Sequence, residues 1–184
     1  VASMAIIYNP NKKIFTLHTA HTTYQMQVDT LGYLLHLYYG EKTNSSMDYV
    51  LTYADRGFSG NPYAAGMDRT YSLDALPQEY PSLGTGDYRN IALNIKNEKG
   101  VESADLLFKS YEIRSGKYQL QGLPAVWADE NEAQTLEIVL ADENAQVEVH
   151  LLYGVLEETD VITRSVRIKN MGTGQITIEK AAAA

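Results

Sequence analysis

The chain has 184 residues, of which 45% are hydrophobic and 21% charged, with a formal net charge of −8 and no cysteine. This composition excludes a disordered or fibrous protein and suits one domain or one large sandwich. The absence of cysteine excludes disulfides, thiolate metal sites and a cysteine nucleophile. The acidic balance argues against a nucleic-acid partner, and no apolar run approaches the roughly 20 residues of a membrane-spanning helix. Since the first residues also lack a secretion signal, we expect a cytoplasmic protein that binds neither nucleic acid nor membrane.

The two ends of the chain are set apart from the fold prediction. Residues 1–3 precede Met4 and are predicted to be a vector remnant, and residues 181–184 are all alanine and are predicted to be a tag or a poly-alanine tail. The remaining residues, 4–180, are expected to form one domain.

Apolar and polar residues alternate along much of the chain, which is typical of half-buried strands. The first runs follow a turn signal at residues 9–11. One run carries Tyr24, Met26 and Val28, and the next carries Leu31, Tyr33, Leu35, Leu37 and Tyr39 on one parity.

The same alternation returns in the second half of the chain. Its runs cover residues 106–108, 111–113, 118–120, 136–140, 147–155, 166–168 and 176–178. Turn residues separate the runs at 97–100, 114–117, 141–144 and 170–172. Only residues 130–135 could hold even one helical turn. The pattern predicts an all-β fold, a large antiparallel β-sandwich.

One segment, from about residue 48 to residue 89, interrupts the alternation and accumulates glycine and proline. A compact domain seldom carries a segment of this length without regular structure unless the segment binds a ligand or packs on another surface. We therefore expect function to reside in this segment.

Tyrosine is concentrated in and just before this segment, with nine of the 14 tyrosines between Tyr33 and Tyr88. A tyrosine offers an apolar ring face and a polar hydroxyl, which suits a sugar as well as a protein interface. Tyrosines also fill sheet faces, and for any single one of them this structural role is the more frequent.

Carboxylates in the same segment raise the hypothesis of a glycosidase acid pair, which needs two carboxyl groups about 5 to 9.5 Å apart. The acids are Asp55, Asp68, Asp74, Glu79 and Asp87. Several stand next to an arginine, a pattern more typical of ion pairs that hold a loop together. We predict no catalytic residue among them.

Two further motifs are rejected as cofactor sites. His18 and His21 are three residues apart, so on a strand they would point to opposite faces and could not share a metal ion. The short motif at residues 84–86 lacks the third glycine and the following helix of a phosphate-binding loop. The sequence predicts neither a metal nor another cofactor.

Longer strings carry a resemblance to a known family. The first three are DRGFSGNP at residues 55–62, DRTYSLD at 68–74 and LPQEYP at 76–81. They continue with GTGDYR at 84–89, GLPA at 122–125, TLEI at 135–138 and RSVRIKN at 164–170. Over about residues 4–180 the chain resembles the N-terminal region of family 36 α-galactosidases.

This resemblance implies an N-terminal β-supersandwich that precedes a catalytic (β/α)₈ barrel. The family consists of hydrolases of carbohydrate metabolism, namely glycosidases that cleave terminal α-galactosides such as melibiose and raffinose. They act with retention, and their two catalytic aspartates lie in the barrel. A barrel needs about 250 residues, so we expect this chain to lack it and to be inactive by itself.

The resemblance also implies partners: the barrel of the parent chain, α-galactoside sugars and a homo-oligomer, since bacterial members of the family form tetramers. In these a loop of the N-terminal domain reaches the active site of a neighbouring subunit. The residues expected in that loop are Tyr53, Asp55, Arg56 and Phe58. The alternative is a free-standing carbohydrate-binding module. Because a surface made for another domain exposes apolar area, we also expect the chain to self-associate.

Overall fold

The computed structural model describes residues 4–55, 63, 68–84, 90–121 and 132–183. Within them the chain forms strands and one short 3-10 helix, η1 (Asp48–Val50). The strands are β1 (Ile6–Asn9), β2 (Ile14–His18), β3 (Thr22–Val28), β4 (Leu34–Glu41), β5 (Leu93–Asn97), β6 (Leu107–Ser115), β7 (Ala133–Asp142), β8 (Val147–Leu156), β9 (Val161–Asn170) and β10 (Ile176–Ala181). In this part of the chain no helix has the length and apolarity needed to cross a membrane.

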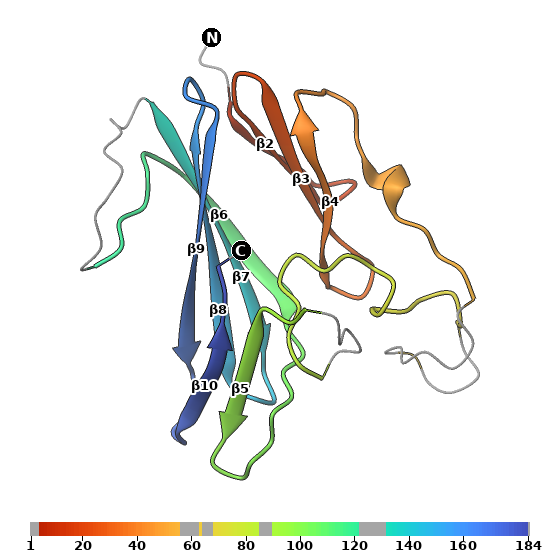
Figure 1. Cartoon of the computed structure of the whole chain (residues 1–184), viewed down its shortest axis with the longest axis vertical. Coiled ribbons are helices and arrows are strands. Elements are labelled where there is room, and N and C mark those ends of the chain that lie inside the picture. Colours follow the sequence, from red (N-terminus) through yellow and green to blue (C-terminus); the bar gives the residue numbers. More distant parts are fainter. Residues whose placement is uncertain (1–3, 56–62, 64–67, 85–89, 122–131, 184) are drawn as a thin grey trace.

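The strands form two four-stranded sheets and one two-stranded sheet (Figure 1). The first sheet has the order β1-β2-β3-β4, the second β6-β7-β8-β9, and β5 pairs with β10. Every ladder is antiparallel. Short turns join successive strands throughout the first sheet and from β7 to β9 in the second. The predicted antiparallel all-β sandwich is confirmed.

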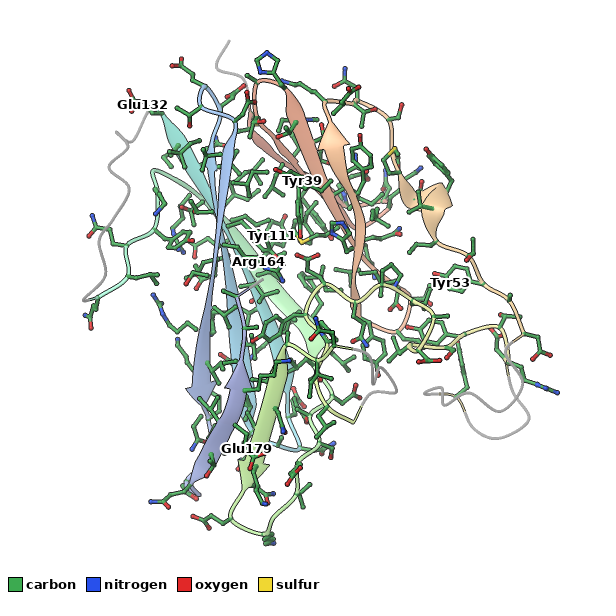
Figure 2. The ribbon with its side chains drawn as sticks, in the orientation of Figure 1. Tyr39, Tyr53, Tyr111, Glu132, Arg164 and Glu179 are labelled. Atoms are coloured by element: carbon green, nitrogen blue, oxygen red, sulfur yellow. The ribbon has the colours of Figure 1, made fainter. Side chains whose placement is uncertain are left out.

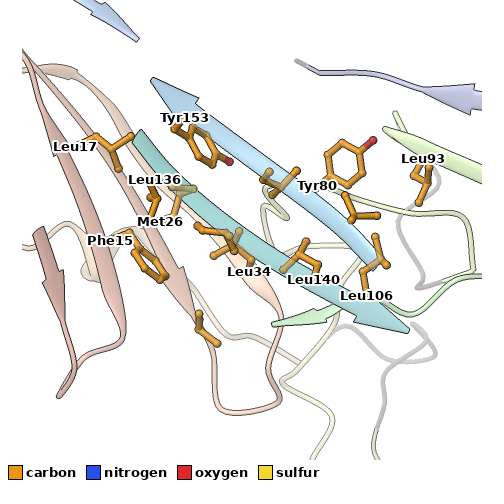
Figure 3. Packing of buried hydrophobic residues seen from close by; sticks show 14 of the residues in the cluster. Phe15, Leu17, Met26, Leu34, Tyr80, Leu93, Leu106, Leu136, Leu140 and Tyr153 are labelled. Carbon is orange, nitrogen blue, oxygen red and sulfur yellow. The ribbon is translucent and has the colours of Figure 1, made fainter. Parts of the chain in front are cut away.

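The main core lies between the two four-stranded sheets (Figure 3). Alternation along each strand sends every second side chain inward, so Phe15 and Leu17 of β2 meet Leu136 of β7 and Tyr153 of β8. The four side chains are fully buried. Tyr80, Leu93 and Leu106 extend the same core toward the small sheet, where the chain leaves the irregular segment.

Aromatic rings close one side of the sandwich, where the edge strands β1 and β6 face each other. The ring of Phe15 lies 4.6 Å from that of Tyr8 and 5.1 Å from that of Tyr111. Phe108 completes the cluster at 6.0 Å from Phe15. Such contacts stabilise the sandwich beyond simple burial of area, by about 0.5–1.5 kcal/mol per pair.

Three strand predictions are wrong in detail. The pairing of β3 with β4 shifts between Gln25 and Met26, and this β-bulge turns Tyr39 away from the face on which Leu35 lies. The two runs expected within residues 106–113 belong to one strand, β6, whose pairing with β7 shifts between Phe108 and Ser110. Residues 118–120 form no strand, since the N–H of Tyr118 is bound by the Thr135 hydroxyl (3.0 Å) instead of a backbone ladder.

Candidate functional site

The segment between β4 and β5 is irregular, as predicted, wherever the structure describes it. It leaves the first sheet through η1 and returns along the edge of β4 (Figure 1). On the return, the N–H of His36 donates to the carbonyl of Pro77 (2.7 Å), and the N–H of Glu79 donates to the carbonyl of Leu34 (2.9 Å). The returning segment therefore covers the free edge of β4, which would otherwise expose unpaired backbone groups.

The predicted site residues lie on the outgoing part of this segment. Tyr53 is half exposed, on the side of the first sheet away from the second sheet (Figure 2). The carboxylate of Asp55 is 3.4 Å from the guanidinium of Arg69, and both side chains are more than half exposed. Arg56 and Phe58, the other two predicted residues, lie outside the described residues. The structure thus brings Asp55 to an arginine that is distant in sequence, across the segment.

A second apolar cluster fastens the segment to the outer face of the first sheet. It joins Tyr33 and Leu35 to Tyr71, Leu73 and Leu76, all of them nearly or fully buried. The ring of Tyr53 stacks at 6.3 Å on that of Tyr71. Tyr53 therefore has one ring contact with a fixed platform while the rest of its side chain remains accessible.

Asp29 ties this cluster to the turn between β3 and β4. One carboxylate oxygen accepts hydrogen bonds from the N–H groups of Leu31 and Tyr33, at 2.9 Å each. The other accepts the hydroxyl of Tyr71. Burial, together with the hydrogen bond to Asp29, raises the pKa of Tyr71, so the hydroxyl is protonated and donates at neutral pH.

The end of the segment is anchored between the two large sheets by the carboxylate of Glu79, whose side chain is 1% exposed. One oxygen accepts hydrogen bonds from the hydroxyls of Tyr24 and Tyr153, the latter at 2.8 Å. It also lies 3.3 Å from the guanidinium of Arg164, whereas the other oxygen lies 3.1 Å from Nδ1 of His36. These four partners come from β3, β4, β8 and β9, so one acid links both sheets to the irregular segment.

The groups around the carboxylate of Glu79 act as hydrogen-bond donors. Burial and the negative charge of Glu79 raise the pKa of Tyr24 and that of Tyr153, so both hydroxyls stay protonated and donate. A further guanidinium nitrogen of Arg164 donates to the backbone carbonyl of Glu79 (2.8 Å). A buried carboxylate with this many donors is satisfied and has a structural role.

Of the remaining acids of the segment, Asp74 is exposed and Asp68 has structural partners. The carboxylate of Asp68 accepts hydrogen bonds from the N–H (2.8 Å) and the hydroxyl of Thr70 (2.6 Å), which lower its pKa. Asp87 lies outside the described residues. Among the residues that the structure does describe, no group of three His, Asp or Glu side chains could hold a metal ion.

The two histidines of the rejected metal motif have separate partners. Nδ1 of His18 is 2.9 Å from the hydroxyl of Thr23, whereas Nδ1 of His21 is 2.6 Å from the carboxylate of Asp160. The second contact joins the turn before β3 to the turn before β9, so it fastens one end of the sandwich.

Sequence reasoning missed the role of Glu79 and of its partner Arg164. A signal for Arg164 exists: it stands at an inward position of β9, between Ile162 and Val166, whose side chains pack on the core. A charged residue at such a position needs a buried counter-charge. The sequence does not show which acid supplies it, because Glu79 is 85 residues away.

Fold and site together define an all-β sandwich domain that presents an anchored segment with tyrosine, carboxylate and arginine side chains. Residues 32–184 match the family described as the glycosyl hydrolase family 36 N-terminal domain. The chain therefore belongs to this family.

Two relatives illustrate the similarity. The chain is 97% identical over 181 residues to the bifunctional alpha-galactosidase/sucrose kinase AgaSK of Mediterraneibacter gnavus, and 41% identical over 180 residues to alpha-galactosidase AgaA of Geobacillus stearothermophilus. The matches cover 98% and 97% of this chain but 19% and 24% of those proteins. The chain thus spans a quarter or less of the relatives' length.

Solved structures agree with these relatives. The galactosidase domain of AgaSK superposes with a TM-score of 0.94 at 97% identity, over 98% of this chain and 25% of that chain. A variant of AgaA from Geobacillus stearothermophilus in complex with raffinose superposes with a TM-score of 0.87 at 40% identity, over 93% of this chain and 24% of that chain.

Proposed function

We propose that this domain belongs to an α-galactosidase that hydrolyses terminal α-galactosides such as melibiose and raffinose with retention, in the cytoplasm. Within that enzyme it has no catalytic residue: it packs on the catalytic barrel, takes part in oligomer assembly and lends a segment to the substrate site. In this proposal residues 4–180 form the N-terminal domain. The lack of cysteine supports a reducing compartment.

The observation that carries the proposal is that one part of the irregular segment is anchored while another part is exposed. Its returning part is anchored by Glu79 and by the second apolar cluster, whereas Tyr53, Asp55 and Arg69 on its outer part are half exposed or more. An anchored segment that keeps aromatic and charged side chains accessible suits recognition of a sugar hydroxyl. We propose that Tyr53, Asp55, Arg56 and Phe58 contact the sugar beyond the galactose, in the active site of an adjacent subunit.

The test uses the full-length enzyme and two substrates, raffinose and a small aryl α-galactoside. Asp55→Ala should lower kcat/KM for raffinose about tenfold, the effect of one lost charged hydrogen bond. The kcat/KM for the aryl substrate should stay within about twofold of that of the unchanged enzyme. Arg69→Ala should show the same selectivity because its guanidinium positions the Asp55 carboxylate. The matched control is Asp74→Ala, which removes an exposed acid of the same segment. Equal losses on both substrates, or none, would contradict the proposal.

The packing role is supported by the surface of β6, an edge strand of the second sheet. Leu107, Tyr111 and Ile113 on this strand are between 36% and 40% exposed. Exposed apolar side chains on an edge strand are typical of a surface that another element covers. We therefore expect this chain, isolated from the rest of the enzyme, to self-associate, and sedimentation of a monomer at high concentration would count against this role.

The alternative is a free-standing carbohydrate-binding module, favoured by the exposed rings of Tyr39, Tyr49 and Tyr53. A module binds sugar alone, whereas a lent segment requires the neighbouring active site. Raffinose-dependent changes in the NMR signals of Tyr53 and Asp55 in the isolated chain would support the module, and unchanged signals would support the lent segment. In either case the isolated chain should not turn over an aryl α-galactoside.

A further inference from the structure

The outer face of the first sheet carries a groove on β1, β2 and β3. Its floor is a row of three side chains that the strand register places side by side: Ile7 opposite Thr16, and Thr16 opposite Gln25. The loop at residues 43–46 forms one wall. The groove has a volume of about 220 Å³, several times the roughly 30 Å³ of one water molecule, so it has space for a ring-sized ligand.

The wall of the groove is held in place before any ligand binds. The side-chain amide of Gln25 donates to the carbonyl of Ser45 (2.9 Å) and its oxygen accepts the N–H of Met47 (2.9 Å). The N–H of Thr43 donates to the hydroxyl of Thr23 (3.0 Å). Because these bonds fix the loop on the sheet, a ligand would lose little free energy in ordering it.

His18 gives the groove an uncharged ring nitrogen. Nδ1 of His18 lies 2.9 Å from the hydroxyl of Thr23, and this hydroxyl also contacts the carbonyl of Thr43 (3.3 Å). Because Nδ1 has this partner, Nε2 is the ring nitrogen left for a ligand hydroxyl, which can donate as well as accept. Burial, together with the charge of Lys42, lowers the pKa of His18, so the ring stays neutral at physiological pH.

The other lining groups are also neutral. Of the lining residues within the described chain, none is Asp, Glu, Lys or Arg. The hydroxyl of Thr16 and the amide of Asn44 have no hydrogen-bond partner among the described residues and can donate and accept. Ile7, 44% exposed, adds an apolar surface for C–H groups.

We propose that this groove is a second ligand site that binds a neutral sugar or polyol, with His18 hydrogen-bonded to one ligand hydroxyl and Thr16 and Asn44 binding others. Neutral donors and acceptors beside an apolar surface match a ring with hydroxyls on its edge and C–H groups on its face. The site does not depend on the segment that carries Tyr53, so it stands or fails separately from the proposed function.

The test is an NMR titration of the whole 184-residue chain with galactose and, separately, with myo-inositol. Binding should shift the imidazole signals of His18 and the amide signals of Thr16 and Asn44, with a Kd in the millimolar range. Thr16→Val, which suits a strand but removes the hydroxyl, should weaken binding about five- to tenfold, as should Asn44→Ala. Thr177→Val, the same change on exposed β10, is the matched control and should leave the Kd unchanged.

Two outcomes would overturn the proposal. One is unchanged His18, Thr16 and Asn44 signals with either ligand up to about 100 mM, a concentration that detects a Kd of about 10 mM. The other is equal or tighter binding of galacturonate, because an ionised carboxylate binds best beside a cation, which these neutral residues do not supply. The proposed function has different readouts, the raffinose selectivity of Asp55→Ala and the signals of Tyr53, so the two failures are distinguishable.

Discussion

Replacement of Glu79 by glutamine tests whether one buried acid joins the irregular segment to both sheets. Glutamine has nearly the same shape and can still accept from the hydroxyls of Tyr24 and Tyr153, but it leaves the guanidinium of Arg164 without its counter-charge. Breaking a buried ion pair costs about 3–5 kcal/mol. Because the tyrosine contacts survive, we expect the lower end, a loss of about 3 kcal/mol in the free energy of unfolding.

Urea denaturation followed by circular dichroism measures this loss, and a thermal melt should show a decrease in Tm of about 6–12 °C for a chain of this size. Glu158→Gln, which changes an exposed acid in the turn before β9, should stay within about 0.5 kcal/mol of the parent. Adding Arg164→Met to Glu79→Gln should recover part of the loss, since it removes the unpaired charge. A similar small effect of Glu79→Gln and Glu158→Gln would refute the reasoning.

Three further changes test other parts of the fold. Phe15→Ala, which removes the fully buried ring at the centre of the aromatic cluster formed with Tyr8, Phe108 and Tyr111, should cost about 3–5 kcal/mol by urea denaturation. Gly84→Ala should lower Tm, because Gly84 has a φ of +101° and a Cβ there would lie 2.5 Å from Cβ of Ser103; an unchanged Tm would contradict that close approach. Hydrogen bonds from His21 lower the pKa of Asp160 to about 2, so the stability that Asp160→Asn removes should be fully present above about pH 4 and disappear as the pH falls to 2. Thermal melts of both chains across this range check the sign, and a difference that persists at pH 2 would oppose it.

The local sequence was enough to predict the strands and the class of fold. Period-two alternation in residues 147–155 places Val149, Leu151 and Tyr153 on one face, and the structure buries all three in the main core. The turn at residues 97–100 is also a local property, since Gly100 has a φ of +78° and its N–H donates to the carbonyl of Asn97 (3.0 Å). Such features depend on a few neighbouring residues, so pattern reasoning finds them.

Predictions failed where the outcome depends on a partner strand. The β-bulge in β4 separates Tyr39 from Leu35, although both have the same parity in sequence, because the register is set by pairing with β3. Tyr118 lies outside any strand because its N–H is bound by a side chain of β7. Neither the β-bulge nor the hydrogen bond to Tyr118 is indicated by the residues next to it in the sequence.

For the site, the sequence alone determined the irregular segment, its tyrosines and acids, and the family that its strings resemble. The tertiary structure decided which acids are structural: Glu79 sits between the sheets with Arg164, and Asp55 faces Arg69 on the exposed outer part. It also decided that Ile7, Thr16 and Gln25 share one groove. The physical reason is the same in each case, since ion pairs and strand registers join residues that are far apart in sequence, and only the packing of the two sheets sets those distances.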